Sequence, residues 1–243
     1  MNNDLIGAGI LLAYYLVVAA LLPVLLKYRF GVKTEYVRKT HHIAYSLSIF
    51  LLLNLFSTWY YAIGAAFLLV LLGYPALLLV EKTAFYRKYF VERTKEQGEL
   101  RRQLIYVQLS FALLILIFWG LLGTSWHYIA AVAVMGWGFG DAAAALVGKT
   151  FGKRRMLHRY IEKAKTFEGT IAMVIAAGLA TFFTLLFYAG MPWLQSLLIS
   201  LVAAPVCSVV ELFSRKGSDT LTVPLSASAV IIPLIYLFSV LGW

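Results

Sequence analysis

Residues 126–155 read WHYIAAVAVMGWGFGDAAAALVGKTFGKRR, and this stretch contains the pattern that decides the fold. It begins at a tryptophan, continues through a long and mostly apolar run, and ends in a cluster of Lys and Arg. A helix needs roughly 20 such residues to cross the hydrocarbon core of a bilayer. Tryptophan is enriched at membrane–water interfaces, and loops rich in Lys and Arg stay on the cytoplasmic side. The stretch therefore predicts a membrane-spanning helix at 126–147 whose basic end is inside.

The same alternation of apolar and basic stretches runs along the whole chain. All 21 Lys and Arg residues fall in four short segments, at 27–39, 82–102, 149–165 and 215–216. The connections at 56–58, 123–125 and 189–192 contain none, and neither do the two ends of the sequence. Of the 11 carboxylates, all but Asp4 lie with the basic segments or at their membrane edge. This bias indicates one charged inner face, where we expect the chemistry to take place.

We therefore predict an all-α, polytopic membrane protein with about eight transmembrane helices, short loops and both termini on the outer side. The expected spans are 5–26, 42–56, 59–80, 104–122, 126–147, 169–188, 193–212 and 222–241. The second is short, so it is either tilted or begins within the preceding loop. We expect one integral membrane domain, 1–243, with cytoplasmic active-site loops at 27–41, 81–103, 148–168 and 213–221.

Composition excludes several classes of protein. The chain is 62% hydrophobic and only 13% charged, which is far from the composition of a soluble domain. Its net charge of +10 is what orienting a polytopic protein requires, so we expect no nucleic-acid partner. The single cysteine, Cys207, lies in an apolar run and supports neither a disulfide framework nor a cysteine metal site.

The longest polar stretch, 84–103, has two interpretations. Phe85, Tyr89 and Phe90 fall on one face of a helix whose other face carries basic residues, as in an interfacial amphipathic helix. A solvated linker with scattered aromatic residues explains the same stretch.

An unusual carboxylate and a glycine repeat occur together at 136–153. On a regular helix, Asp141 would lie about 10 Å below the membrane surface at which the polar loop begins. A carboxylate at that depth is costly unless it pairs or binds a cation, so Asp141 is a candidate functional residue. Small residues recur every four positions, at Gly136, Gly140, Ala144 and Gly148. They suit either tight helix packing or close approach of the backbone to a phosphate. In the second case Lys149 and Lys153 supply positive charge beside Gly152. The spacing is not that of a Walker P-loop.

The next segment, 163–170, reads KAKTFEGT and leads into the sixth expected span. Thr166 is a candidate N-cap, and the free N–H groups of such a helix start attract an anion. Lys165 adds a point charge of the kind that phosphate binding uses. An ordinary capped helix start is the alternative.

Four carboxylates from three loops converge on the predicted inner face: Asp141, Glu168, Glu211 and Asp219. Carboxylates beside phosphate-binding groups are how Mg²⁺ is held during phosphoryl transfer. The alternative is that they pair with the surplus of basic residues. The first inner loop ends in Arg38, Lys39 and His42, for which contact with a lipid headgroup or a phosphate is favoured over a metal site.

Four segments together resemble the CTP-dependent polyprenol kinase family, which includes dolichol kinases, phytol kinases and a CTP-dependent diacylglycerol kinase. They are Arg38-Lys39-x-x-His42, Gly140-Asp141-x-x-Ala144 with Gly148-x-x-x-Gly152-Lys153, Lys165-Thr166-x-Glu168-Gly169, and Val210-Glu211 followed by Asp219-x-Leu221-Thr222-Val223-Pro224. The family usually has Asp-Asn-Leu where this chain has Asp219-Thr220-Leu221, which weakens any role for a side-chain amide there.

The resemblance implies a lipid kinase that transfers the γ-phosphate of CTP to the hydroxyl of a polyprenol, dolichol, phytol or diacylglycerol. The choice of cytidine rests on the resemblance alone. We expect catalytic roles for Asp141, Asp219, Lys165 and Glu168, and Mg²⁺ ligation by Asp141 with Asp219 or Glu211. The expected nucleotide-binding residues are Gly140, Gly148, Lys149, Gly152, Lys153, Lys165, Thr166 and Gly169.

Two other functions are considered. Phosphatidate cytidylyltransferases resemble the chain from Asp141 to Gly169, but their C-terminal Pro-Gly-His-Gly-Gly signature is absent. A transporter with Asp141 as its coupling charge would carry polar residues in several spans, whereas most of the expected spans carry no charge.

The predicted topology can be tested by cysteine labelling in intact cells. Cysteines introduced at Lys95, Lys153 and Lys216 are expected to resist a membrane-impermeant thiol reagent, because their loops should be inside. Cysteines introduced at Thr58 and Thr124 are expected to react. The opposite labelling would contradict the topology and, with it, the placement of the motifs on the inner face.

Overall fold

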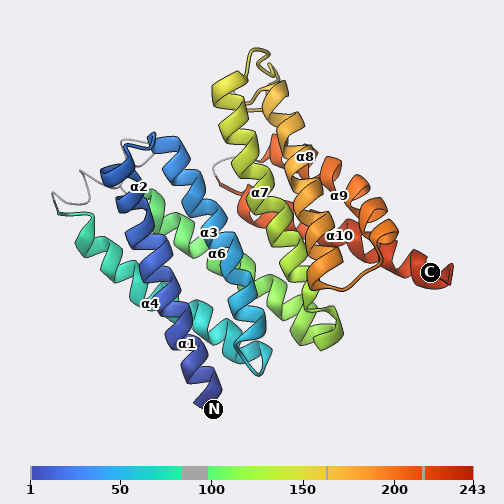
Figure 1. The fold of residues 1–243 in the computed structure, drawn as a ribbon, viewed down its shortest axis with the longest axis horizontal. Coiled ribbons are helices and arrows are strands. Elements are labelled where there is room, and N and C mark those ends of the chain that lie inside the picture. The colour runs from blue at the N-terminus through green and yellow to red at the C-terminus, as the bar shows by residue number, and fades with distance from the viewer. Residues whose placement is uncertain (1, 84–97, 163, 215–216, 243) are drawn as a thin grey trace. The chain divides into compact units, whose positions relative to one another are not determined.

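The computed structural model describes residues 2–83, 98–162, 164–214 and 217–242 (Figure 1). Within these ranges the regular elements are all helices, and β-pairing is limited to one isolated bridge between Arg155 and Thr166. The predicted all-α class is therefore confirmed. The chain divides into two compact units, Met1–Gly123 and Thr124–Trp243. The single membrane domain expected from the sequence stays a prediction.

The first unit contains α1 (Asn2–Tyr14), the π-helical η1 (Tyr15–Leu21), α2 (Leu22–Phe30), α3 (Thr34–Asn54), α4 (Trp59–Val80), α6 (Glu99–Ile115) and the π-helical η2 (Leu116–Leu121). The first three form one continuous helical run, which ends at Gly31 with a left-handed φ of 60°. Gly98 has a φ of 102° and precedes α6. The amphipathic helix considered at 84–103 falls largely on 84–97, outside the described residues.

Among the described residues, six helices are long and apolar enough to cross a membrane: Trp59–Val80, Leu100–Leu121, Thr124–Phe151, Phe167–Tyr188, Trp193–Phe213 and Asp219–Val240. They match six of the eight predicted spans, and this number of apolar helices is that of an integral, multi-pass membrane protein. The two other spans and the orientation of the termini stay predictions. The short second span, 42–56, largely coincides with the later part of α3, which begins earlier, at Thr34, in the basic loop and ends at Asn54.

Buried polar side chains join three helices of the first unit. The Gln108 Nε2 group of α6 donates to the Tyr15 hydroxyl, with 2.5 Å between the two atoms. The Tyr15 hydroxyl lies 2.9 Å from Ser48 Oγ of α3, which donates to the Tyr45 carbonyl at 2.7 Å. Because polar groups buried in a bilayer must be satisfied by the protein, this chain of hydrogen bonds fixes η1 and α6 against α3.

An ion pair joins the C-terminal end of α4 to the first turn of α6. Arg101 Nε lies 2.9 Å from both carboxylate oxygens of Glu81, which is only 3% exposed. The same guanidinium donates to the Tyr74 hydroxyl at 3.3 Å and lies over that ring. We call this arrangement the Glu81–Arg101 clasp.

The second unit contains η3 (Thr124–Trp126), α7 (Tyr128–Phe151), α8 (Phe167–Phe183), the π-helical η4 (Thr184–Tyr188), α9 (Trp193–Phe213) and α10 (Asp219–Val240). Of the six candidate spans, α7 is the most buried, and it packs against α8 and α10 (Figure 1). The outer surfaces of α8, α9 and α10 expose large apolar side chains, such as Ile175, Leu201 and Tyr236, as lipid-facing surfaces do.

The small-residue face of α7 is the surface that packs against α8. A Cβ atom added to Gly136 would lie 2.9 Å from Thr181 Oγ1, and one added to Gly140 would lie 3.0 Å from the Ala177 Cβ. Near the start of α8 the relation is reciprocal, because a Cβ on Gly169 would lie 2.7 Å from the Ala144 carbonyl oxygen. Of the two interpretations of the glycine repeat, helix packing is the one that this geometry confirms.

The close contact of α7 and α8 predicts a cost for a single methyl group. Gly169→Ala is expected to lower the free energy of unfolding by about 1–3 kcal/mol, because the new Cβ meets rigid backbone rather than a flexible side chain. The measurement is unfolding of the purified protein in detergent, followed by circular dichroism.

Gly64→Ala is the matched control, because a Cβ at this position of α4 meets nothing within 4 Å. That variant should be as stable as the wild type or more stable, since alanine favours a helix over glycine by up to about 1 kcal/mol. Equal stability of the Gly169→Ala and Gly64→Ala proteins would contradict the tight packing of α7 on α8.

Candidate active site at one end of the second unit

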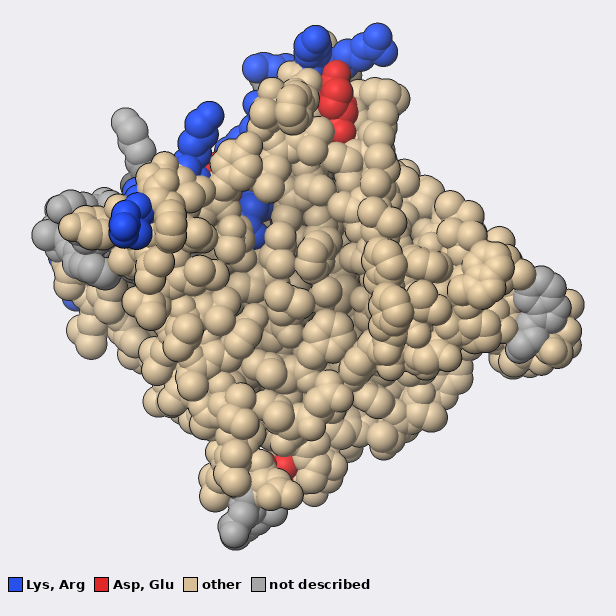
Figure 2. Space-filling view, in the orientation of Figure 1, with Lys and Arg blue, Asp and Glu red and all other residues tan. Residues whose placement is uncertain are grey.

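The loop between α7 and α8 carries most of the exposed charge of the second unit. Figure 2 shows Lys and Arg side chains gathered where α7 is joined to α8. The exposed basic residues of this region are Lys149, Lys153, Arg154, Arg155 and Arg159. The structure thus places Lys149 and Lys153, both predicted to contact phosphate, on the surface at the end of α7.

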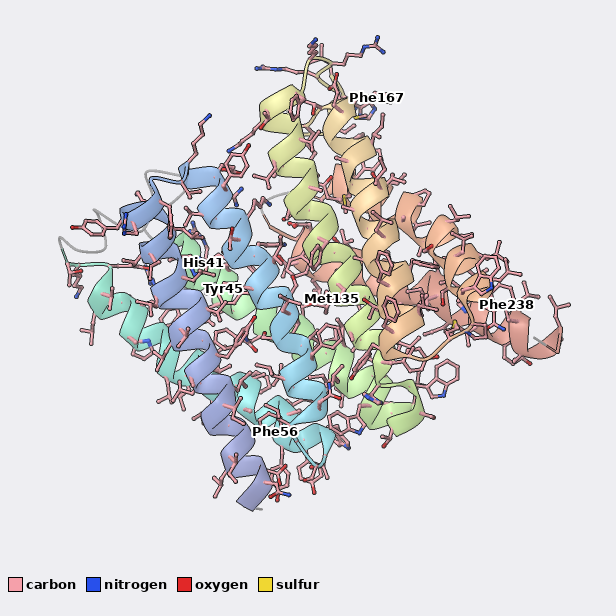
Figure 3. The ribbon with its side chains drawn as sticks, in the orientation of Figure 1. His41, Tyr45, Phe56, Met135, Phe167 and Phe238 are labelled. Atoms are coloured by element: carbon pink, nitrogen blue, oxygen red, sulfur yellow. The ribbon has the colours of Figure 1, made fainter. Side chains whose placement is uncertain are left out.

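The start of α8 is fixed by its own first residues. Thr166 caps the helix, because its Oγ1 atom accepts a hydrogen bond from the Gly169 amide at 3.1 Å. This confirms the cap predicted from the sequence. The loop is paired to this helix start by two backbone bonds, from Phe167 N to Arg154 O at 2.9 Å and from Met156 N to Lys165 O at 3.1 Å. Phe167 therefore begins α8 next to the basic loop (Figure 3).

Glu168 also binds the loop. Both of its carboxylate oxygens lie 3.3 Å from the Arg154 amide nitrogen, which donates to them. In this position Glu168 neutralises part of the positive charge of the loop and fixes its backbone. The catalytic role predicted for Glu168 stays a prediction, and the role that the geometry assigns to it is positioning.

Gly148 and Gly152 allow the last turn of α7 to approach Thr166. A Cβ on Gly148 would lie 3.0 Å from Thr166 Oγ1, and one on Gly152 would lie 2.7 Å from Thr166 Cγ2 and 2.1 Å from the Gly148 carbonyl oxygen. Glycine is required here by packing. The nucleotide-binding role of Gly140, Gly148, Gly152 and Gly169 stays a prediction.

Lys165 is held at the C-terminal end of α9. Its ammonium group lies 2.9 Å from Glu211 Oε1 and donates to the backbone carbonyls of Glu211 and of Ser214, the latter at 3.2 Å. A lysine ammonium has only three N–H donors. All three therefore have acceptors on α9 and its C-cap, and a phosphate could bind Lys165 only by replacing one of them.

Glu211 is the meeting point of the carboxylates that the sequence singled out. It is buried, with 8% of its surface exposed, and it lies near enough to Asp141, Asp219 and Lys165 for their charges to act on it. Asp141 comes from α7, and Asp219 is the first residue of α10. Three helices thus contribute one carboxylate each to this neighbourhood, whereas Glu168, the fourth carboxylate of the predicted cluster, binds the loop backbone. The catalytic and metal-binding roles expected of these carboxylates stay predictions.

Trp137 is a member of this group that the sequence analysis missed. Its indole Nε1 atom donates to Asp219 Oδ2 at 3.3 Å, although the residue is completely buried. A signal was present, because Trp137 lies one helical turn before Asp141 and so shares its face of α7. The bond orients the Asp219 carboxylate towards α7.

The three carboxylates of Asp141, Glu211 and Asp219 can hold Mg²⁺ only when other ligands complete the site. Among the described residues, no group of three or more His, Cys, Asp or Glu side chains is arranged to hold a metal ion unaided. Mg²⁺ is normally bound by one or two carboxylates together with water and substrate phosphates. Asp141 and Asp219 are suitable oxygen donors of that kind, while Glu211 already pairs with Lys165.

Arg38, Lys39 and His42 belong to the first unit, on α3. Arg38 Nη2 lies 2.6 Å from Glu35 Oε1, whereas Lys39 and His42 are 3% and 6% exposed. His41 stacks on Tyr45 with a centroid distance of 5.4 Å (Figure 3). Lys39 and His42 are therefore both buried. The predicted contact of Arg38, Lys39 and His42 with a headgroup or phosphate stays a prediction.

A comparison with known proteins adds one similarity. The chain is 35% identical over 101 residues to the phytol kinase of Synechocystis sp., and the match covers 42% of each chain. The matched region thus covers less than half of the length of this relative. Phytol kinases are among the enzymes that the four sequence segments resemble, so the similarity confirms that resemblance. No family model matches the chain. No solved structure matches it either.

The contacts of Lys165 predict that it stabilises the second unit. Lys165→Met keeps the aliphatic stem but leaves Glu211 buried near two other carboxylates. Removing one partner of a buried pair typically costs about 3–5 kcal/mol, so the free energy of unfolding in detergent should fall by that order. The double variant with Glu211→Gln should lose less than the sum of the two single variants.

Lys153→Met is the control for the loss of one positive charge from the same loop. Its side chain is exposed, so its stability should stay within about 0.5 kcal/mol of the wild type. A Lys165→Met protein as stable as Lys153→Met would show that the buried ion pair does not hold the loop to α9.

Proposed function

We propose that this protein is an integral membrane lipid kinase that transfers the γ-phosphoryl group of CTP to the hydroxyl of a membrane isoprenoid alcohol of the polyprenol, dolichol or phytol type, or of a diacylglycerol. The observation that carries the proposal is the meeting of Asp141, Glu211 and Asp219 with Lys165 beneath a basic loop, at the end of apolar helices. The similarity to phytol kinase supports a lipid alcohol as acceptor.

Phosphoryl transfer suits this arrangement of residues. The reaction needs little covalent chemistry from a protein, because catalysis consists mainly of positioning and of stabilising the charge on the phosphoryl oxygens. The exposed Lys149 and Lys153 can neutralise the polyphosphate, and the carboxylates lie at the ends of apolar helices, where a lipid hydroxyl could meet them. No nucleophile on the protein is required.

Mg²⁺ is the cofactor that these donors would hold, through Asp141 together with Asp219 or Glu211. When bound beside the donor phosphates, it would neutralise their charge. Trp137 orients Asp219 through its 3.3 Å hydrogen bond. Asp141 and Asp219 are the two candidates to orient the lipid hydroxyl or accept its proton.

Lys165 and Glu168 act as positioning residues in this proposal. Lys165 ties the basic loop to α9, and Glu168 binds the backbone of the same loop at Arg154. Together they hold the loop that follows Lys149 and contains Lys153 against the start of α8 and the end of α9. A phosphate that displaces one carbonyl from Lys165 would gain a charge-assisted hydrogen bond at that point.

The cytidylyltransferase alternative shares the segment from Asp141 to Gly169 but lacks support elsewhere. Its C-terminal signature is missing from the sequence, and the similarity to phytol kinase favours transfer of a phosphoryl group. The proposal places the reaction at the cytoplasmic face, as the distribution of basic residues predicts.

The proposal is tested by incubating the purified protein with Mg²⁺, lipid alcohols and CTP labelled at the γ-phosphate. Label is expected to move to the lipid, with CTP strongly preferred to ATP. Asp141→Asn should lower this activity by about 10²-fold or more, since it removes one strong electrostatic contact from the transition state. Folding should persist, because an amide is cheaper to bury than a carboxylate.

Asp4→Asn is the matched control. Asp4 belongs to the other unit and binds the Ser57 amide at 2.7 Å through an oxygen that asparagine retains, so activity should be unchanged. Release of pyrophosphate without transfer of label would indicate a cytidylyltransferase. Near-normal turnover of Asp141→Asn at saturating Mg²⁺ would show that Asp141 is structural.

A further inference from the structure

We propose that Tyr160, with His158 and Phe213, forms a platform on which the base of the nucleotide stacks. The inference rests on the proposed function and names the part of the protein that recognises the nucleoside. None of these aromatic residues belongs to the sequence motifs of the site. The structure brings them together from the basic loop and from the last residue of α9.

The three rings lie together in one cluster. The His158 ring lies 5.6 Å from the Tyr160 ring and meets the Phe213 ring edge-on at 6.3 Å, measured between centroids. Tyr160 and Phe213 are each about half exposed, at 49% and 50%. The turn is held by the Ile161 amide, which donates to the His158 carbonyl at 3.0 Å. The platform is therefore held in place by its turn and is also exposed to a ligand.

Positive charge covers one face of the Tyr160 ring, which leaves the opposite face for a base. The Arg159 guanidinium is over the Tyr160 ring, 4.6 Å from its centroid. An aromatic ring next to a guanidinium suits a ligand that carries both a flat π-system and negative charge. Nucleotides combine these two properties.

The platform is attached to the same end of α9 as the carboxylate cluster. Phe213 ends that helix two residues after Glu211, and Ser214, the next residue, accepts a hydrogen bond from Lys165 at 3.2 Å. The loop thus reaches the end of α9 twice, once through His158 and once through Lys165. A nucleotide whose base stacks on Tyr160 would therefore lie at the end of α9 that Lys165 also contacts.

Anchoring of the loop at the membrane interface is the competing explanation, because tyrosine is enriched there. The two roles require different properties of the side chain. An interfacial anchor needs apolar surface, which leucine supplies. Stacking needs a π-face, which phenylalanine and tryptophan supply and leucine does not.

The test measures binding of radiolabelled CTP to the full-length protein in detergent, and competition by inorganic tripolyphosphate, which has no base. Tyr160→Leu is expected to raise the dissociation constant for CTP roughly 5- to 100-fold, the range typical of losing one base–aromatic stack, while competition by tripolyphosphate is unchanged. Tyr160→Phe and Tyr160→Trp should bind CTP like the wild type. Tyr236→Leu, at a lipid-facing tyrosine of α10, is the matched control and should have no effect.

Unchanged CTP binding by Tyr160→Leu would overturn the inference. Equal weakening of CTP and tripolyphosphate would also overturn it, because the substitution would then act on the phosphate region. If the wild type binds CTP more tightly than Tyr160→Leu does but transfers no phosphate to lipid, the proposed kinase activity is contradicted and the base-stacking platform is supported. If phosphate is transferred from CTP equally well by the wild type and by Tyr160→Leu, the kinase activity is supported and the platform is contradicted. Failure of the wild type to bind CTP would overturn both.

Discussion

The buried pair between Lys165 and Glu211 is the interaction on which the candidate site depends. The Lys165 ammonium group lies 2.9 Å from Glu211 Oε1. It neutralises a carboxylate that would otherwise be buried in the second unit without a cation beside it. The same ammonium group satisfies carbonyls at the C-terminal end of α9, where the helix dipole is negative. One side chain therefore fixes the loop, the end of α9 and the neighbourhood of Asp141 and Asp219.

The second constraint is the close contact of α7 with α8, without which Lys165 would not reach α9. Glycines on both helices bring the backbones together, and Gly169 approaches the Ala144 carbonyl too closely for any side chain. The capped start of α8 then sets where the loop returns to the helices. Packing and chemistry thus share one segment, so the same short motif contains both glycines and charged residues.

Much of this site could be predicted from the sequence because its signals are local. The Thr166 cap follows from the residue type and its position before an apolar run, and the convergence of Asp141, Glu211 and Asp219 follows from their depth beside basic loops. The charge pattern and apolar lengths similarly indicated the helical, multi-pass fold. Contacts between distant residues could not be predicted in the same way. The saturation of Lys165 depends on the carbonyls of Ser214 and Glu211, and the Trp137–Asp219 bond depends on how α10 packs on α7. The burial of Lys39 was missed because α3 begins earlier than its apolar run.

The Glu81–Arg101 clasp has a consequence for how this protein tolerates change. It fastens α4 to α6 directly at the two ends of the segment that connects them, so the pairing of the helices does not rely on that segment. The entropy of closing a loop grows only with the logarithm of its length, and each doubling costs about 0.6 kcal/mol. The connection between these helices can therefore change in length at a small cost in free energy while the pairing of α4 with α6 is kept.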